Sequence, residues 1–226
     1  MLPLWVLCTA CPSYAVFQIA QTCPTPTAAS WRRCYPRVAY RCFDDERMAS
    51  FVRAHDARWA AQWPALPGIV RADAFRYLFA WHVGGVYADS DCSCVRPYPQ
   101  GAPLVVGVES ALASSREARR VGMREGVQFV QWTFASEPRQ PAMDMALVQL
   151  ARALPAPSPL ADPWVLNATG PWLFTRACLA QRAKRVLPKC AFAATGYPTR
   201  ACAPGSVLSQ HLYAQSWRRS RHFGQL

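Results

Sequence analysis

The sequence is poor in acidic residues and in lysine. Only 13 of its 226 residues are Asp or Glu, and of its 25 basic residues only Lys184 and Lys189 are not arginine. The formal net charge of +12 indicates affinity for anionic partners such as phosphate-bearing ligands, acidic lipid headgroups or nucleic acid. A coding bias towards arginine and alanine explains the same charge equally well.

Long basic runs are missing too, and so are zinc-finger, homeodomain and RNA-recognition signatures. The nearest basic run, SWRRSRHF at residues 216–223, is short. We therefore expect no nucleic-acid partner.

Charged side chains are absent from the first 31 residues. Residues 1–20, MLPLWVLCTACPSYAVFQIA, are long enough to span a bilayer as a signal anchor, but they lack a basic flank and contain Pro3 and Pro12. We assign residues 14–20 to a first buried strand. Residues 1–13 are then either an apolar lead-in or the remnant of a signal anchor, which leaves membrane association open, and residues 14–226 form one domain.

Apolar side chains and cysteine are plentiful. Apolar residues make up 52% of the chain, which is enough to fill the core of a 25.1 kDa domain, and the 12% aromatic content argues against disorder. Ten cysteines favour an oxidising lumen and some disulfides, whose pairing the sequence does not fix. Cys8 and Cys11 have C-x-x-C spacing, but no second pair completes a zinc site, so sulfur ligation of a metal is the less favoured interpretation.

Strand-like and helix-like segments alternate along the chain. The expected strands are 14–20, 37–43, 86–88, 103–109 and 127–136, and the expected helices are a short one from about Ala28, then 44–55, 69–82, 140–154 and 170–183. Residues 110–126 are polar, and we expect them to be mobile. No internal repeat is evident, and the alternation indicates an α/β sandwich.

Three of the rare acids gather in one segment, RADAFRYLFAWHVGGVYADSDCSC (71–94). We expect the strand that starts at Val86 to run into Asp89 and Asp91, and residues two apart in a strand face the same way. Both carboxylates would then point into the crevice where open α/β sheets bind ligands. Two like charges this close repel each other unless a cation lies between them, and oxygen ligands suit Mg²⁺ or Mn²⁺ held together with substrate phosphates.

Asp73 and Arg76 share a face of the preceding helix because they are three residues apart. In the same crevice they would offer an acceptor and a fork of donors to a polyhydroxylated ligand. An Asp-x-Asp tripeptide alone is most often a solvated turn. The Asp-x-x-Arg helix, the Gly84-Gly85 helix end and the aromatic strand start together favour the metal-site hypothesis.

The segment RADAFRYLFAWHVGGVYADSDCSCVRPY resembles the glycosyltransferase sugar-binding region containing a DXD motif. This is the family, glycosyltransferase family 32, of the yeast-type α-1,6-mannosyltransferases and the inositolphosphorylceramide mannosyltransferases. The matching elements are Asp73-Ala-Phe-Arg76, Gly84-Gly85-Val-Tyr87-x-Asp89-x-Asp91 and Arg96-Pro97.

Four further segments are similar to the family: FQIAQTCPTPTAASWRRCYPRVAYRCFDDE (17–46), QWTFASEPRQP (131–141), ATGPWLFTRA (168–177) and HLYAQSW (211–217). The resemblance therefore extends over roughly residues 14–217. The chain departs from the family at Phe17, where a His is usual, and at Gln131, where an Asn is frequent.

The resemblance implies the GT-A fold, a single Rossmann-like nucleotide-sugar transferase domain with a mixed, mostly parallel central sheet. It implies retaining, metal-dependent transfer of a hexose, with mannose favoured, from a nucleotide-diphosphate sugar such as GDP-mannose or a UDP-hexose. The acceptor would be a glycan or glycolipid hydroxyl. The cofactor would be Mn²⁺ or Mg²⁺, and the location the Golgi or secretory-pathway lumen, with or without a membrane anchor.

The resemblance also implies roles for individual residues. Asp89 and Asp91 would bind the metal, with His211 as the third protein ligand, and Arg76 would act with the two acids in catalysis. No obvious nucleophile is present, since Gln131 is neutral. A front-face route, in which the leaving phosphate takes the proton of the acceptor hydroxyl, is therefore the default hypothesis.

Donor binding would involve five residues. Asp73 and Arg76 would hold the sugar hydroxyls, and Asp89 would touch the ribose. Tyr87 would help to seat the nucleotide, and the indole N–H of Trp217 would donate to a phosphate oxygen.

Two other interpretations stay open. One is a non-catalytic nucleotide-sugar or carbohydrate-binding relative of the family, and the other is a cysteine-rich secreted interaction protein in which the acids are structural. Asn167-Ala-Thr169 is a glycosylation sequon that overlaps the Thr-Gly-Pro element, and we expect it to be unmodified.

Overall fold

Two sheets organise the part of the chain that the computed structural model describes, which is residues 14–111, 126–157, 159–194 and 202–212. The larger sheet has the order β2-β1-β3-β7-β5-β6, with β8 beside β5, and the smaller one has the order β4-β10-β9. The strands are β1 (Ala15–Ile19), β2 (Ala39–Phe43), β3 (Gly85–Ala88), β4 (Cys92–Cys94), β5 (Leu104–Ala111), β6 (Val127–Phe129), β7 (Thr133–Ser136), β8 (Arg185–Leu187), β9 (Phe192–Ala194) and β10 (Ser209–His211).

The larger sheet is mixed. β1 pairs in parallel with β2 and β3, and β5 pairs in parallel with β8. β7 runs antiparallel to both β3 and β5, and β6 runs antiparallel to β5. The α/β class with a mixed central sheet is confirmed.

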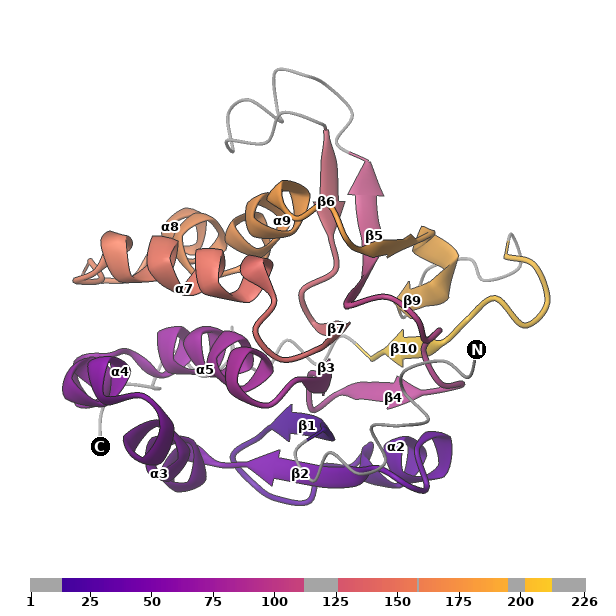
Figure 1. Ribbon diagram of the computed structural model, residues 1–226, viewed down its shortest axis with the longest axis horizontal. Helices are drawn as coiled ribbons and strands as arrows, with labels where there is room; N and C mark the ends of the chain where they lie inside the picture. Colours follow the sequence, from indigo (N-terminus) through magenta and orange to yellow (C-terminus); the bar gives the residue numbers. More distant parts are fainter. Residues whose placement is uncertain (1–13, 112–125, 158, 195–201, 213–226) are drawn as a thin grey trace.

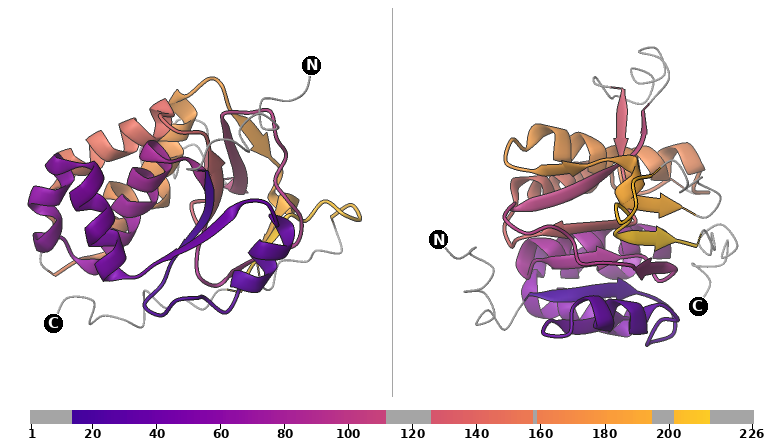
Figure 2. Two further views of the ribbon diagram at one scale, coloured as in Figure 1. Left: turned by 60° about the horizontal axis from the view of Figure 1, so that its bottom comes forward. Right: turned by 90° about the vertical axis from the view of Figure 1, so that its right-hand side faces the viewer.

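Helices cover the larger sheet on one side, and α2 lies with the smaller sheet on the other (Figure 1). The two views in Figure 2 show the same layering. The helices are α2 (Ala28–Cys34), α3 (Asp45–His55), α4 (Ala57–Gln62), α5 (Gly68–His82), α7 (Pro141–Ala153), α8 (Asp162–Ala168) and α9 (Pro171–Ala180), with short 3₁₀ turns η2 (Trp63–Ala65) and η3 (Lys189–Ala191).

The alternation of side chains along the strands builds a core on each face of the larger sheet. Phe17 and Phe134 point into the helix-covered cluster, where they pack with Phe79 of α5 and Phe174 of α9. Their neighbours along the strands, Val16 in β1 and Ala135 in β7, belong to the second cluster, under α2 and the smaller sheet. Burial on both faces fixes the register of the central strands, because a slip by one residue would exchange the two sets of side chains.

Helix α5 is the central helix and is buried along most of its length, including Asp73 and Arg76. It ends at His82, and Gly84 follows with a φ of +74°, as the Gly-Gly pair predicts. Gly85 has a φ of +125°, and a Cβ there would lie 2.0 Å from the carbonyl oxygen of Ala15. The second glycine therefore lets β3 pair closely with β1.

Disulfides join segments around the smaller sheet and the edge strand β2. They link Cys23 with Cys42, Cys34 with Cys94, and Cys190 with Cys202. The expectation of disulfides is confirmed, while Cys8 and Cys11 lie outside the described residues, as do residues 1–13 as a whole. Within the described ranges, no helix has the length and apolar character needed to cross a bilayer.

Two strand predictions are wrong in detail. Residues 127–136 form two strands, β6 and β7, because the chain turns between them and brings Gln131 and Trp132 to the cleft described below. Strand β3 stops at Ala88, one residue before the first acid of the motif. Of residues 110–126, which we expected to be mobile, Ser110 and Ala111 instead belong to β5, and residues 112–125 lie outside the described part of the chain.

Candidate functional site

A cleft of about 1980 Å³ opens beside the carboxyl ends of β1 and β3. This is the edge of an α/β sheet at which ligands usually bind. Pockets for single small ligands typically measure about 300–1,000 Å³, so this cleft has room for two substrates at once. The polar residues singled out from the sequence line it: Asp73, Arg76, Tyr87, Asp89, Asp91, Gln131 and His211.

Asp89 and Asp91 belong to a turn between β3 and β4. The Cys92 N–H donates to the Asp89 carbonyl oxygen at 2.9 Å, which closes the turn. The two carboxylates do converge, as we predicted, but strand alternation is not the reason. A turn places both side chains on the cleft side and leaves the backbone of the motif accessible to neighbouring side chains.

His211 reaches the acidic pair from the other end of the chain. Strand β10 pairs antiparallel with β4, and His211 lies opposite Cys92. The imidazole Nε2 is 3.3 Å from Asp91 Oδ1 and 3.8 Å from Asp89 Oδ2. One ligand atom from each of the three side chains lies within 4.8 Å of the others, so the structure brings together the trio predicted to bind the metal.

Two members of the trio, Asp89 and His211, have shifted pKa values. Burial raises the pKa of the Asp89 carboxyl, but Arg76, His211 and the Tyr87 hydroxyl outweigh it and leave the pKa below its usual value. Burial lowers the pKa of His211, while Asp89, Asp91 and Glu109 together raise it above its usual value. Asp89 is therefore ionised at neutral pH, and a metal would bind His211 in its neutral form.

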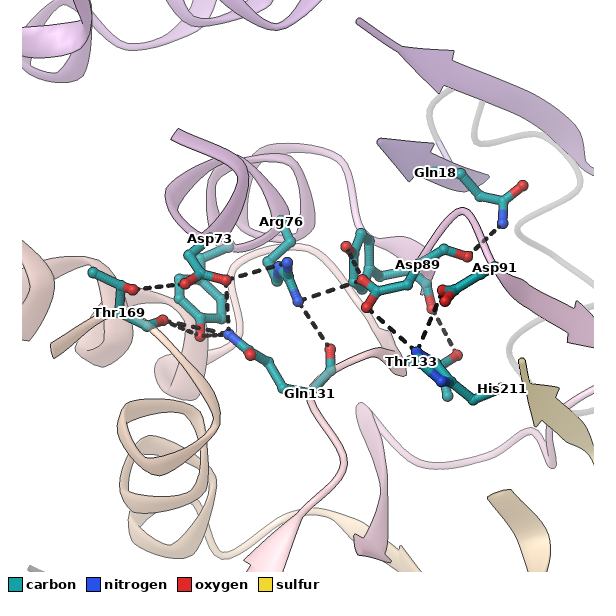
Figure 3. Close-up of polar contacts among 11 residues, drawn as sticks. Gln18, Asp73, Arg76, Asp89, Asp91, Gln131, Thr133, Thr169 and His211 are labelled. Atoms are coloured by element: carbon teal, nitrogen blue, oxygen red, sulfur yellow. Dashed lines mark hydrogen bonds and ion pairs between the residues drawn. The ribbon is translucent and has the colours of Figure 1, made fainter. Parts of the chain in front are cut away.

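Asp73 lies at the other end of a row of polar side chains (Figure 3). Its Oδ1 is 3.1 Å from Arg76 Nη2 and accepts a hydrogen bond from Gln131 Nε2 at 3.2 Å, while its Oδ2 accepts from the Thr169 hydroxyl at 2.6 Å. Burial raises the pKa of Asp73, against the opposing effects of Arg76 and Thr169. Asp73 is thus a carboxyl group whose polar partners are supplied by the protein itself.

Arg76 connects the two acidic positions. Its Nη2 contacts Asp73, and its Nη1 is 3.5 Å from Asp89 Oδ1, so a single guanidinium group bridges both carboxylates. The guanidinium carbon lies 4.7 Å from the centre of the Tyr87 ring, and the Tyr87 hydroxyl donates to the same Asp89 oxygen. Tyr87 is almost fully buried, and its contacts help to fix the positions of Arg76 and Asp89.

Three buried side chains that we did not single out hold the backbone of the acidic turn. They donate to carbonyl oxygens of residues 89–92: Gln18 Nε2 at 2.8 Å, Thr27 Oγ1 at 3.0 Å and Trp31 Nε1 at 2.7 Å. The Gln18 Oε1 in turn accepts from the hydroxyls of Thr25 and Tyr40, which fixes the orientation of the amide. The only sequence signal for this clamp was a polar glutamine inside an apolar strand.

The donor set fits the expected cofactor. Two carboxylates beside one imidazole can hold a divalent cation, and the carboxylates suit Mn²⁺ or Mg²⁺. The two carboxylates are held close to each other, an arrangement that a bound cation stabilises. Trp217, the expected phosphate donor, lies outside the described residues.

Residues 10–111 match the family described as the glycosyltransferase sugar-binding region containing a DXD motif. The initiation-specific alpha-1,6-mannosyltransferase of Schizosaccharomyces pombe is 27% identical over a segment that covers 50% of this chain and 32% of that protein. This chain therefore matches about a third of the length of its yeast relative.

Among solved structures, the galactosyltransferase LgtC in complex with donor and acceptor sugar analogs is similar with a TM-score of 0.51 and 12% identity, covering 93% of this chain and 92% of that one. The predicted GT-A fold is thereby confirmed. Over residues 10–111, a little under half of the chain, this protein is similar to the glycosyltransferase sugar-binding region containing a DXD motif.

Proposed function

We propose that this protein is a metal-dependent, retaining glycosyltransferase that moves a hexose, with mannose favoured, from a nucleotide-diphosphate sugar to a hydroxyl group of a glycan or glycolipid. The observation that carries the proposal is the convergence of Asp89, Asp91 and His211, which come from distant parts of the chain, beside the Asp73–Arg76 pair. The mannosyltransferase name of the yeast relative supports the choice of mannose.

Asp89, Asp91 and His211 would hold Mn²⁺, or Mg²⁺ in its place. When bound, such an ion neutralises the negative charge that develops on the departing diphosphate as the glycosidic bond breaks. The side chains contribute a fixed geometry: Arg76 and Tyr87 hold Asp89, and the clamp from Gln18, Thr27 and Trp31 fixes the turn. A preorganised site of this kind requires little rearrangement during the reaction.

Asp73 and Arg76 would bind the hydroxyl groups of the donor sugar. Both are buried at the wall of the cleft, and their positions are fixed by Thr169 and Gln131. The amide of Gln131, which is neutral, is the nearest side chain to this pair on the β6–β7 turn. We therefore propose the front-face route: the bond from the anomeric carbon to the diphosphate breaks, the bond to the acceptor oxygen forms on the same face, and the acceptor proton passes to the diphosphate.

Residues after β1 and β2 line the end of the cleft nearest the edge of the sheet, and we assign the nucleotide to this end. The three disulfides support a location in an oxidising compartment such as the Golgi or secretory-pathway lumen.

A panel of nucleotide sugars, incubated with Mn²⁺ and the wild-type chain, tests the proposal through donor hydrolysis and transfer. We expect turnover of at least one donor and near-complete loss in Asp91→Asn. Asp144→Asn, which changes an exposed acid on α7 outside the cleft, is the matched control and keeps full activity. Donor binding without turnover would instead support the non-catalytic relative, and equal turnover by wild type and Asp91→Asn would refute the metal assignment.

A further inference from the structure

Glu109 is an acidic residue of the cleft that none of the assigned roles uses. It lies in β5, where the pairing of β5 with β6 shifts register between Val108 and Ser110. A register shift of this kind is a β-bulge at Glu109, and bulges commonly re-aim one side chain beside an active site. The bulge thus places a carboxylate at the cleft, in a strand whose other residues are mostly apolar.

A second side chain of the cleft fixes the carboxylate. Gln128 of β6 donates through Nε2 to Glu109 Oε2, and Gln128 also lines the cleft. This contact occupies Oε2 and leaves Oε1 for a ligand. A carboxylate beside an amide offers both acceptors and a donor, which is the combination that binds neighbouring hydroxyl groups of a sugar.

Glu109 is near the metal-binding trio without belonging to it. The charges of His211 and Asp89 both act on it, yet it is not part of the group whose ligand atoms converge. Burial raises the pKa of its carboxyl, while Gln128 and His211 act in the opposite direction. A negative charge here would repel the diphosphate of a donor, so the fitting ligand is a neutral one.

The order of strands separates Glu109 from the donor. The nucleotide end of the cleft lies at β1 and β2, the acidic turn follows β3, and Glu109 and Gln128 lie on the far side, in β5 and β6. We propose that Glu109, oriented by Gln128, binds the acceptor by accepting hydrogen bonds from hydroxyl groups of a neutral hexoside. This inference rests on the proposed function, since it takes the donor to occupy the other end of the cleft.

The test uses the intact chain loaded with Mn²⁺ and GDP or UDP, and it measures the binding of a panel of methyl hexosides by titration calorimetry. At least one hexoside binds the wild type, and Glu109→Gln weakens its binding by about 10- to 100-fold, the usual cost of losing a hydrogen bond to a charged group. The affinity for the nucleotide and Mn²⁺ stays the same. Glu137→Gln, in a partly buried glutamate outside the cleft, is the matched control and leaves hexoside binding unchanged.

Three results would overturn the assignment. The first is that no hexoside binds the wild type, and the second is that a hexoside binds Glu109→Gln as tightly as it binds the wild type. The third is that Glu109→Gln loses affinity for the nucleotide and Mn²⁺ as well as for the hexoside. In an active enzyme, the KM for the hexoside rises and donor hydrolysis is retained. Hexoside binding that depends on Glu109 in a chain without turnover would confirm the subsite while refuting the transferase, so the two failures are distinguishable.

Discussion

Asp73 and Asp89 share one partner, Arg76, but their surroundings differ. Asp73 accepts from Thr169 and Gln131 in addition to Arg76, and its side chain is nearly inaccessible. Asp89 is partly exposed to the cleft, next to Asp91 and His211. Burial raises the pKa of both carboxyls; at Asp73 the pKa stays raised, whereas at Asp89 the combined effect of Arg76, His211 and the Tyr87 hydroxyl outweighs burial and lowers the pKa.

Arg76 therefore contacts two carboxyl groups in different environments, one buried among protein partners and one partly exposed to the cleft. At Asp73 the protein supplies the partners, so the carboxyl is a fixed part of the cleft wall to which we assign the donor sugar. At Asp89 the protein leaves room for a cation, so the carboxylate is ready for a ligand. Four experiments separate the two positions, beginning with the one that affects both.

Replacing Arg76 should have the largest effect. Arg76→Ala leaves Asp73 as a buried charge without its cation, so the free energy of unfolding falls by about 3–5 kcal/mol, and activity drops at least about 100-fold. Chemical denaturation and donor turnover measure the two effects. Arg152→Ala, an exposed arginine on α7, is the control and changes neither.

A second substitution sharpens this result. In Arg76→Ala combined with Asp73→Asn, no buried charge is left without a partner, so most of the lost stability returns while activity does not. If the double variant is as unstable as Arg76→Ala, the ion pair is not what Arg76 contributes to the fold.

His211→Ala should affect only the Asp89 position. It removes one of three ligands, and we expect the affinity for Mn²⁺ in the presence of a nucleotide diphosphate to fall by at least about 100-fold, the upper range for changes in supporting residues. Titration calorimetry measures the affinity. His55→Ala, an exposed histidine of α3, serves as control, and an unchanged Mn²⁺ affinity in His211→Ala would remove the imidazole from the site.

Thr169→Val should affect only the Asp73 position. The substitution keeps the side-chain shape but removes the hydroxyl that donates to Asp73 Oδ2, which costs about 1–3 kcal/mol of stability. We expect the affinity for the donor sugar to fall as well, because Asp73 loses the hydroxyl group that fixes its position. Mn²⁺ affinity stays within about two-fold of wild type, because the substituted group does not contact the metal trio; a larger change would show that the two positions are coupled through Arg76.

The pH dependence of stability, measured in the presence of a chelator, should give the smallest effect and the clearest contrast in sign. The folded-state pKa of Asp73 lies above its ordinary value of 3.8, so its contribution to stability decreases as the pH rises from 3.8 through the folded pKa. The folded-state pKa of Asp89 lies below 3.8, so its contribution is complete above 3.8 and is lost as the pH falls through the folded pKa. The unfolding free energy of each variant, Asp73→Asn or Asp89→Asn, is subtracted from that of wild type at pH values below and above 3.8. We expect this difference to fall as the pH rises for Asp73 and to increase as the pH rises for Asp89. Slopes of the same sign would contradict the comparison.

Local patterns in the sequence predicted most of the fold. Helices α3, α5, α7 and α9 follow from apolar spacing and their end signals, and the Gly84-Gly85 pair correctly marked the end of α5. Short strands such as β4 and β10 escaped prediction because three residues carry no periodicity. The break between β6 and β7 escaped because Val130 and Trp132 continue the apolar pattern while the backbone turns.

The site was predictable to the extent that its residues are close in sequence or belong to a family motif. The acidic pair and the Asp73–Arg76 helix were found from spacing, and His211 only from the resemblance. Gln18 and Glu109 were missed because their positions depend on contacts that local patterns do not contain: Gln18 binds the backbone of a turn 71 residues away, and Glu109 lies at a bulge in the pairing of β5 with β6.

The pairing of β10 with β4 has a consequence for the order in which the protein is made. A ribosome releases Asp89 and Asp91 long before it releases His211, and the imidazole lies beside them through the pairing of β10 with β4. The nascent chain therefore carries the two acids without their third partner until His211 has left the ribosome. The trio of Asp89, Asp91 and His211 can assemble only after all the segments that supply it have been made.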